Sequence, residues 1–213
     1  MANSNRFADR TDAGERLAAE LVDRGIDADL VLAIPRGGLP LGRAVADALD
    51  APLDIVVASK IGAPGNPEYA IGAVASDGSV WIDDDAIAGL SVSDSYIERE
   101  REHEIQVARE KASRYRGDSE APDLTGKTVV VVDDGVATGS TAIAALRLVR
   151  ERGAERVVLA LPVAPPQTVS ELETEADAVV CLRTPSRFGA VGAFYERFDQ
   201  VSDEEAMAYL ADE

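Results

Sequence analysis

Residues 128–141 read TVVVVDDGVATGST, and this stretch decides the fold class. The first five residues all have β-branched side chains, which predicts a strand buried on both faces, as in the centre of a parallel sheet. Two carboxylates end the run abruptly. Two glycines and three hydroxyl side chains then form a loop that leads into a helical pattern. A strand, a glycine-containing loop and a helix in this order are typical of an open α/β sheet.

The remainder of the chain repeats this alternation of strand-like apolar runs and helical patterns. It predicts one domain over residues 1–213, with a central, mostly parallel sheet flanked by helices and a core at about 11–182. We expect strands at 29–34, 53–59, 128–132, 156–163 and 178–182, and helices at 11–24, 39–49, 93–116, 138–152, 165–175 and from about 202.

Two segments interrupt the alternation. Residues 60–66 are rich in glycine and proline and are expected to form a loop. A hairpin is expected next, because Asp77-Gly78 separates apolar runs at 70–75 and 79–82. The helix at 93–116 is highly charged and has sparse apolar residues, so only a narrow stripe of it is expected to pack.

The formal net charge is -18, and the only lysines are Lys60, Lys111 and Lys127. Nucleic-acid binding is disfavoured, because phosphate contacts need clustered Lys and Arg. The acids are spread over the whole chain. This distribution favours solubility in high internal salt, as in halophiles, over recognition of a basic partner.

The sequence indicates a cytoplasmic protein. Cys181 is the only cysteine, so no internal disulfide can form, and the N-terminus lacks the apolar run of a signal peptide. No apolar stretch approaches the ~18 residues of a membrane span. We expect Cys181 in the core and His103 on the surface. Neither has partners at catalytic or metal-ligand spacing, and no metal site made by the protein alone is predicted.

The turn after residue 132 combines two kinds of chemistry. Ligands of open α/β folds bind at the carboxyl ends of strands, and a helix N-terminus with free N–H groups favours an anion. Glycines let the backbone wrap a phosphate, while the hydroxyl groups donate to its oxygens. The two carboxylates would repel a phosphate and are better suited to accept hydrogen bonds from sugar hydroxyls. A ligand with a phosphate and a cis-diol satisfies both halves of the turn.

This stretch resembles the signature of type I phosphoribosyltransferases, which bind 5-phosphoribosyl-1-pyrophosphate (PRPP). The shared features are four apolar residues, two acids and a Thr-Gly loop. Gly135 departs from the pattern, because the family usually has an aliphatic residue there, and we expect glycine to loosen the loop. A Walker A loop would need a lysine before the Ser or Thr, and none is present. The remaining alternative is an ordinary strand–helix turn with surface acids.

The resemblance implies roles for individual residues. Asp133 and Asp134 would hold the ribose diol and lie near the positive charge that develops on the ribose, and they would be the catalytic residues together with Lys60. Arg36 and Gly37, in the turn Pro35-Arg36-Gly37-Gly38, would bind pyrophosphate together with Lys60, with a cis peptide bond at Arg36–Gly37. Mg²⁺ would be carried by the pyrophosphate. The 5-phosphate would be bound by Val136, Ala137, Thr138, Gly139, Ser140 and Thr141.

The resemblance also implies a flexible loop at about 60–82, able to bring Glu68 and Tyr69 over the site, and a small C-terminal hood at about 183–213 with N-terminal contributions. The hood would form the acceptor pocket, although its aromatic residues could equally serve only to pack it. Ala137 replaces the acid of 6-oxopurine enzymes, which disfavours hypoxanthine or guanine as acceptor. The pocket candidates are Arg183, Phe188, Phe194 and Tyr195.

The chain as a whole is similar to stand-alone predicted phosphoribosyltransferases of bacteria and archaea, whose acceptor the resemblance does not name. The matching pieces are residues 7–10, 35–38, 66–73 and 188–192. The resemblance implies transfer of the 5-phosphoribosyl group to a nitrogen acceptor such as a nucleobase, and a homodimer. Two alternatives remain open: a regulatory protein that senses PRPP or a nucleotide without turnover, and a hydrolase or lyase of a phosphorylated sugar.

Overall fold

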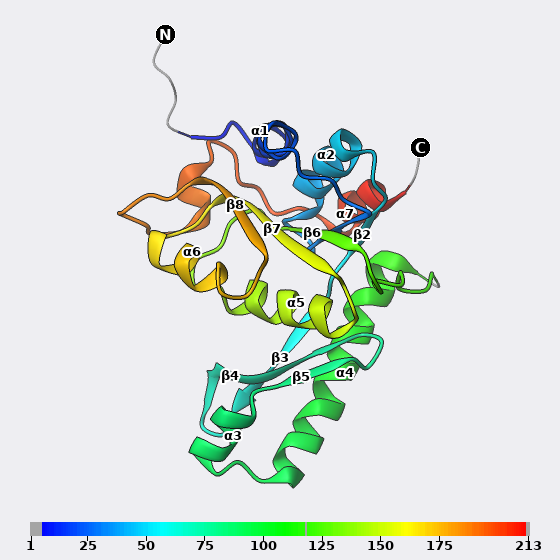
Figure 1. The fold of residues 1–213 in the computed structure, drawn as a ribbon, viewed down its shortest axis with the longest axis vertical. Coiled ribbons are helices and arrows are strands. Elements are labelled where there is room, and N and C mark those ends of the chain that lie inside the picture. Colours follow the sequence, from blue (N-terminus) through cyan, green and yellow to red (C-terminus); the bar gives the residue numbers. More distant parts are fainter. Residues whose placement is uncertain (1–5, 118, 212–213) are drawn as a thin grey trace.

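The structure is a computed structural model that describes residues 6–117 and 119–211. Its centre is a five-stranded sheet in the order β2-β1-β6-β7-β8, in which every neighbouring pair is parallel (Figure 1). The predicted central position of the valine-rich strand is confirmed. The strands are β1 (Leu30–Ala33), β2 (Leu53–Ile55), β6 (Thr128–Val132), β7 (Arg156–Val163) and β8 (Ala178–Arg183).

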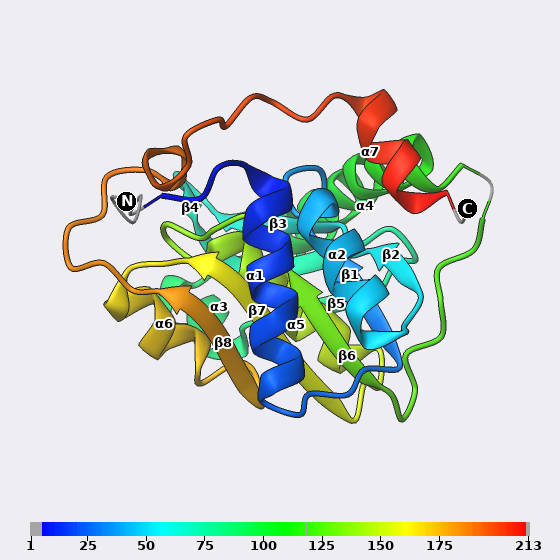
Figure 2. The same cartoon turned by 90° about the horizontal axis from the view of Figure 1, so that it is seen from above.

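Helices cover both faces of this sheet (Figure 2). On one face α1 (Arg10–Asp23) and α2 (Leu39–Leu49) pack over Val130 and Val132. On the other, α5 (Ser140–Glu151) and α6 (Pro166–Leu172) pack over Val129 and Val131. Alternate residues of β6 therefore enter two different cores, which is why the strand is apolar at both parities.

A projecting arm extends from one end of the core (Figure 1). It contains an antiparallel sheet of β3 (Ala58–Ala63), β4 (Asn66–Ala75) and β5 (Val80–Ile82), followed by α3 (Asp84–Leu90) and α4 (Asp94–Arg116). One side of the small sheet packs on α5, and the other packs on α3 and α4. The predicted long helix and the hairpin at Asp77-Gly78 are confirmed, with Gly78 at φ 91°.

Two expectations about this region are wrong. The apolar run at 53–59 is divided between β2 and β3, which belong to different sheets. Residues 60–66 form no loop, because β3 continues to Ala63 and β4 begins at Asn66. The glycines of this stretch allow a tight hairpin. Gly65 has φ 75°, and a Cβ on Gly62 would lie 2.7 Å from the Pro67 Cα. Sequence patterning also missed α3, which begins after an Asp83 cap.

The chain after β8 returns across the core to the N-terminal segment (Figure 2). Phe7 N donates to Phe194 O at 2.8 Å, and Glu196 N donates to Phe7 O at the same distance. The 3-10 turn η1 (Val191–Phe194) lies in this stretch, and α7 (Asp203–Leu210) ends it after the predicted start near Ser202. Within the described residues, no helix has the length and apolar character that crossing a membrane requires.

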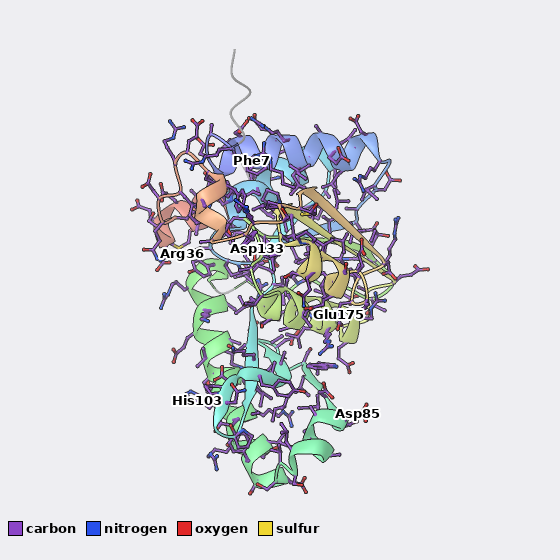
Figure 3. All side chains as sticks on the ribbon, turned by 90° about the vertical axis from the view of Figure 1, so that its left-hand side faces the viewer. Phe7, Arg36, Asp85, His103, Asp133 and Glu175 are labelled. Atoms are coloured by element: carbon purple, nitrogen blue, oxygen red, sulfur yellow. The ribbon has the colours of Figure 1, made fainter. Side chains whose placement is uncertain are left out.

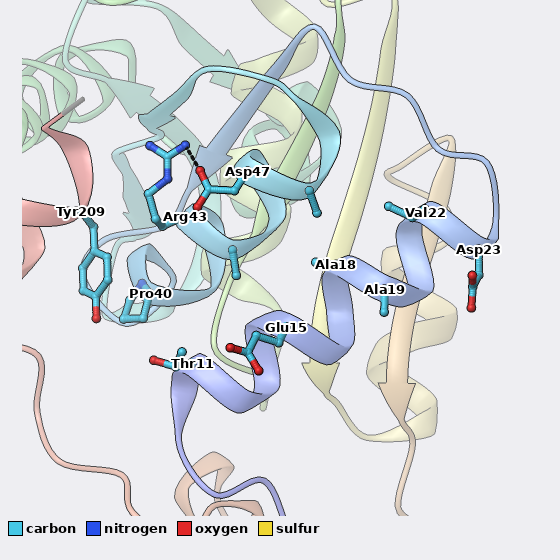
Figure 4. A pocket seen from close by; sticks show the side chains of 12 residues that line it. Thr11, Glu15, Ala18, Ala19, Val22, Asp23, Pro40, Arg43, Asp47 and Tyr209 are labelled. Atoms are coloured by element: carbon cyan, nitrogen blue, oxygen red, sulfur yellow. Dashed lines mark ion pairs between the residues drawn. The ribbon is translucent and has the colours of Figure 1, made fainter. Parts of the chain in front are cut away.

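A groove of about 750 Å³ lies between α1 and α2 (Figure 4). Small side chains such as Ala18 and Ala19 line it, together with an ion pair between Arg43 and Asp47. None of the residues assigned above to ligand binding lines this groove. It is therefore separate from the turn that follows β6.

Candidate functional site

An acid pair follows the last residue of β6. Asp134 Oδ2 accepts a hydrogen bond of 2.7 Å from Arg10 Nε, and Asp134 N donates to Asp133 Oδ1 at 2.8 Å. In the part of the chain that the structure describes, no ion pair involves Asp133. Asp133 and Arg36 lie in the core half of the molecule, away from Asp85 and His103 on the projecting arm (Figure 3). The central strand thus presents two carboxylates, of which one is neutralised.

The two acids differ in their electrostatic surroundings. Burial raises the pKa of Asp133 well above its usual range, and the neighbouring charge of Asp134 raises it further. Burial also raises the pKa of Asp134, but the Arg10 hydrogen bond and charge oppose this. Because like charges in contact cannot both ionise easily, the pair loses its protons in two steps, with Asp134 first.

This order of ionisation predicts how stability depends on pH. A raised pKa means that the folded state keeps a proton that the unfolded state releases. The stabilisation of the folded state by protonated Asp133 is therefore complete below pH 3.8, the usual pKa, and is lost as pH rises through the folded pKa. We therefore expect the unfolding free energy of Asp133→Asn, relative to wild type, to increase with pH. Urea denaturation at a series of pH values measures this difference. Acids with lowered pKa, such as Asp9 and Asp77, affect both proteins equally. A difference that stays constant with pH would contradict the prediction.

The loop after the acids is shaped by contacts with the C-terminal segment. Gly135 has φ 143°, and a Cβ there would lie 2.6 Å from Val191 Cγ1. The missing side chain lets η1 pack against the turn, and the loosening of the loop by this glycine stays a prediction. Val136 N donates to Val163 O at 3.0 Å, so this amide is already used inside the protein.

The next residues have the geometry of an anion site. Gly139, at φ 84°, is the N-cap of α5, and the first amides of a helix have no partner within it. Thr168 Oγ1 fixes the loop by donating to Ala137 O at 2.8 Å. Thr138 Oγ1 lies 3.5 Å from Ser140 Oγ, which places two hydroxyl groups at the same helix end. Thr141 continues this exposed edge in the first turn of α5.

The turn after β1 touches the acid pair. β1 and β6 are neighbours, and a Cβ on Gly37 would lie 2.2 Å from Asp134 Oδ2. Two turns far apart in sequence therefore meet at the carboxyl ends of these two strands. The cis peptide bond is at Pro35–Arg36, one bond before the predicted position. Neither bond precedes a proline, so no local sequence signal distinguishes the two.

The predicted pyrophosphate ligands have different surroundings. Arg36 Nη1 lies 3.0 Å from Asp203 Oδ1 at the start of α7, and Tyr115 OH donates to the same oxygen at 3.0 Å. An incoming pyrophosphate would compete with Asp203 for this arginine. The strand expected at 53–59 would place Lys60 directly after its last residue. That position is wrong, because the run is split and Lys60 lies within β3, where it pairs with Ala73 of β4.

The four acceptor-pocket candidates are not equivalent. Tyr195 is only 3% exposed, and its hydroxyl donates to Asp134 O at 2.6 Å. The rings of Phe188 and Phe194 are 5.2 Å apart, and both residues are partly exposed. The Arg183 guanidinium lies 4.8 Å from the centre of the Phe7 ring. Tyr195 is thus a packing and anchoring residue, whereas the other three remain candidates for contact with a ligand.

Sequence reasoning missed Arg10, Asp203 and the anchoring role of the Tyr195 hydroxyl. Arg10 and Asp134 are 124 residues apart, and no local pattern pairs them. The only signal was that Arg10 belongs to a short N-terminal piece of the wider resemblance. Among the described residues, no cluster of three or more His, Cys, Asp or Glu side chains could hold a metal ion. The acid pair alone supplies too few protein ligands for a Mg²⁺ cage.

Comparison with known proteins identifies relatives along almost the whole chain. The family model described as "Phosphoribosyl transferase domain" matches residues 5–196. A protein of Mycobacterium tuberculosis named "Putative phosphoribosyl transferase" is 44% identical over 205 residues, which cover 96% of this chain and 46% of that protein. The chain therefore spans about half the length of this curated relative.

A solved structure and a further curated enzyme are also similar. The crystal structure of TT1426 from Thermus thermophilus has 45% sequence identity and a TM-score of 0.89, covering 96% of this chain and 97% of that one. The orotate phosphoribosyltransferase of Corynebacterium glutamicum is 31% identical over 118 residues, which cover 52% of this chain and 60% of that enzyme. The fold and the sequence thus point to the same family.

Proposed function

Because the chain belongs to the phosphoribosyl transferase domain family, we propose that it transfers the 5-phosphoribosyl group of PRPP to a nitrogen acceptor and releases pyrophosphate. The main observation in support is that the turn after β1 and the turn after β6 meet at the carboxyl end of β6. Asp133 and Asp134 lie there between the Gly37 turn and the N-terminus of α5. The carboxyl-terminal end of the sheet can therefore bind a diol and a phosphate, and the turn with Arg36 and Gly37, expected to bind pyrophosphate, lies beside them.

In this proposal the bond from C1 of the ribose to pyrophosphate breaks, a bond from C1 to nitrogen forms, and the proton of the acceptor nitrogen passes to solvent. Positive charge develops on the ribose ring, close to the carboxylates that accept its hydroxyl groups. The loop amides from Ala137 onward and the hydroxyls of Thr138 and Ser140 hold the 5-phosphate. Arg36 and Lys60 hold the leaving group, and Mg²⁺ bound to the pyrophosphate oxygens would neutralise part of its charge. Positioning and electrostatics supply most of the acceleration.

The acceptor in this proposal is a planar nitrogenous base. Phe188, Phe194 and Arg183 support it, because partly exposed aromatic rings and a guanidinium can stack on such a base. The orotate enzyme among the relatives acts on a base of this class. The cytoplasmic location and the homodimer stay predictions.

The second candidate function is a sensor that binds PRPP without turning it over. The pairing of Arg36 with Asp203 favours it, because pyrophosphate would displace Asp203 from Arg36 and so change the contacts at the start of α7 when the site is occupied. Turnover separates the two candidates.

The test is pyrophosphate release from PRPP with Mg²⁺ in high salt, screened across nucleobases and other nitrogen acceptors. We expect release that depends on one acceptor, because C1–N bond formation needs that acceptor in the pocket. Calorimetry with PRPP alone gives the binding control. Binding without release for every acceptor would favour the sensor, and absence of PRPP binding would contradict both functions.

A further inference from the structure

We propose that Arg10 is a positioning residue, which holds Asp134 by one carboxylate oxygen and keeps the acid pair charged for the ligand. The inference rests on the proposed function for its ligand, but the contacts that carry it do not. Asp134 uses Oδ2 for the Arg10 bond, and this pair is largely buried, with side-chain exposures of 12% for Arg10 and 14% for Asp134. A pair shielded from solvent is stronger and less screened by salt than a surface pair.

Three contacts fix the Arg10 guanidinium. Its Nε donates to Asp134 Oδ2, and its Nη1 donates to Asp199 O at 2.6 Å. Its carbon centre lies 3.8 Å from the centre of the Phe198 ring. A planar guanidinium can make all three contacts at once, whereas a lysine ammonium has no second donor at a fixed spacing. The first turn of α1 is thereby joined to the C-terminal segment at the acid pair.

The same C-terminal segment holds the backbone of Asp134. Tyr195 OH donates to Asp134 O at 2.6 Å, and the Tyr195 ring packs on Phe198 at 4.8 Å between centres. Phe198 therefore supports both the group that holds the side chain of Asp134 and the group that holds its carbonyl. A functional side chain is most precise when its supporting residues are themselves fixed by packing.

Charge gives Arg10 a second role. The titratable groups that face it here are Asp133 and Asp134 after β6 and the phenol of Tyr195. Burial raises the pKa of both acids, and Arg10 is the cation that lowers the pKa of each. Without Arg10 the pair would hold protons to higher pH, and a protonated carboxyl is a poorer acceptor for sugar hydroxyls.

The test compares Arg10→Gln and Arg10→Lys with wild type in the full chain. Carboxyl ¹³C NMR of the free protein follows the ionisation of Asp133 and Asp134, and calorimetry with PRPP gives the affinity over the same pH range. We expect Arg10→Gln to move the ionisation to higher pH and to weaken PRPP binding about tenfold near neutral pH, with recovery at higher pH. Arg10→Lys keeps the charge but not the three contacts, so it should shift the ionisation less than Arg10→Gln does and should lose part of the affinity.

Arg16→Gln is the matched control. Arg16 lies on the same helix and pairs with Asp12, but it does not touch the acid pair, and its side chain is 49% exposed. Arg16→Gln removes the same charge and should change neither the ionisation of the acids nor the pH dependence of PRPP affinity. An unchanged acid ionisation in Arg10→Gln overturns the inference, and so does an affinity loss of equal size at every pH. Absence of PRPP binding by wild type would overturn the proposed function, while the NMR titration would still decide whether Arg10 controls the acids. If Arg10→Gln does not fold, Arg10→Lys decides: wild-type ionisation together with wild-type affinity for PRPP overturns the inference.

Discussion

The double variant Asp133→Asn, Asp134→Asn is expected to lose PRPP turnover by about three orders of magnitude. Its amides can still accept hydrogen bonds from the ribose hydroxyls, but they carry no negative charge beside the cation that develops at C1. The loss should therefore be mainly in kcat, with a smaller change in PRPP affinity. Pyrophosphate release measures the first, and calorimetry measures the second.

The single variant Asp133→Asn separates the effect of the acid pair on function from its effect on stability. Asp133 has no cationic partner of its own among the described residues, so Asp133→Asn removes a partly buried charge and its repulsion with Asp134. We expect this single variant to unfold at a higher temperature than wild type, since about 1 kcal/mol corresponds to about 2–4 °C in a domain of this size. Asp84→Asn, Asp85→Asn is a matched control, because these adjacent acids are exposed at the start of α3. Full turnover in the first double variant would remove the acid pair from the mechanism.

Gly37→Ala is expected to reduce turnover about a hundredfold and to lower stability, because it breaks the largely buried pair of Asp134 with Arg10. The new Cβ would lie 2.2 Å from Asp134 Oδ2, which is the end of a side chain and can rotate away. Rotation breaks the bond to Arg10 and moves the carboxylate out of register with the ribose. The fold should survive this loss, because the atoms in conflict belong to a side chain and not to the backbone.

A second glycine provides the control for this substitution. Gly89 lies in α3, and a Cβ added there would have no neighbouring atom within 4 Å, so Gly89→Ala adds the same methyl group without contact. Thermal unfolding and pyrophosphate release should both stay close to wild type. Equal turnover in Gly37→Ala and Gly89→Ala would show that the two turns do not act together.

The core of the fold could be predicted because its signals are local. The run at 128–132 is apolar at every position after Thr128, and the strand it predicts is central and covered on both faces. The helix at 39–49 begins with a proline in its first turn and is found with those bounds. The acid pair was also found locally, since two carboxylates at the end of such a strand are visible without the structure.

The rest depended on contacts that no local pattern records. The run at 53–59 shows no break, yet the chain leaves one sheet at Ile55 and enters another at Ala58. The glycines near residue 62 suggested a loop, because antiparallel pairing was not visible from one strand alone. The partners of Asp134 come from both ends of the chain, and long-range pairs of this kind have no sequence period.

The backbone hydrogen bonds of Phe7 with Phe194 and Glu196 have a consequence for the synthesis of the protein. Once β8 has been made, all five strands of the sheet are present, but Asp134 still lacks both Tyr195 and the carbonyl of Asp199 that anchors Arg10. The contacts that hold Asp134 are therefore completed only when the segment that carries Tyr195 and Asp199 has been made.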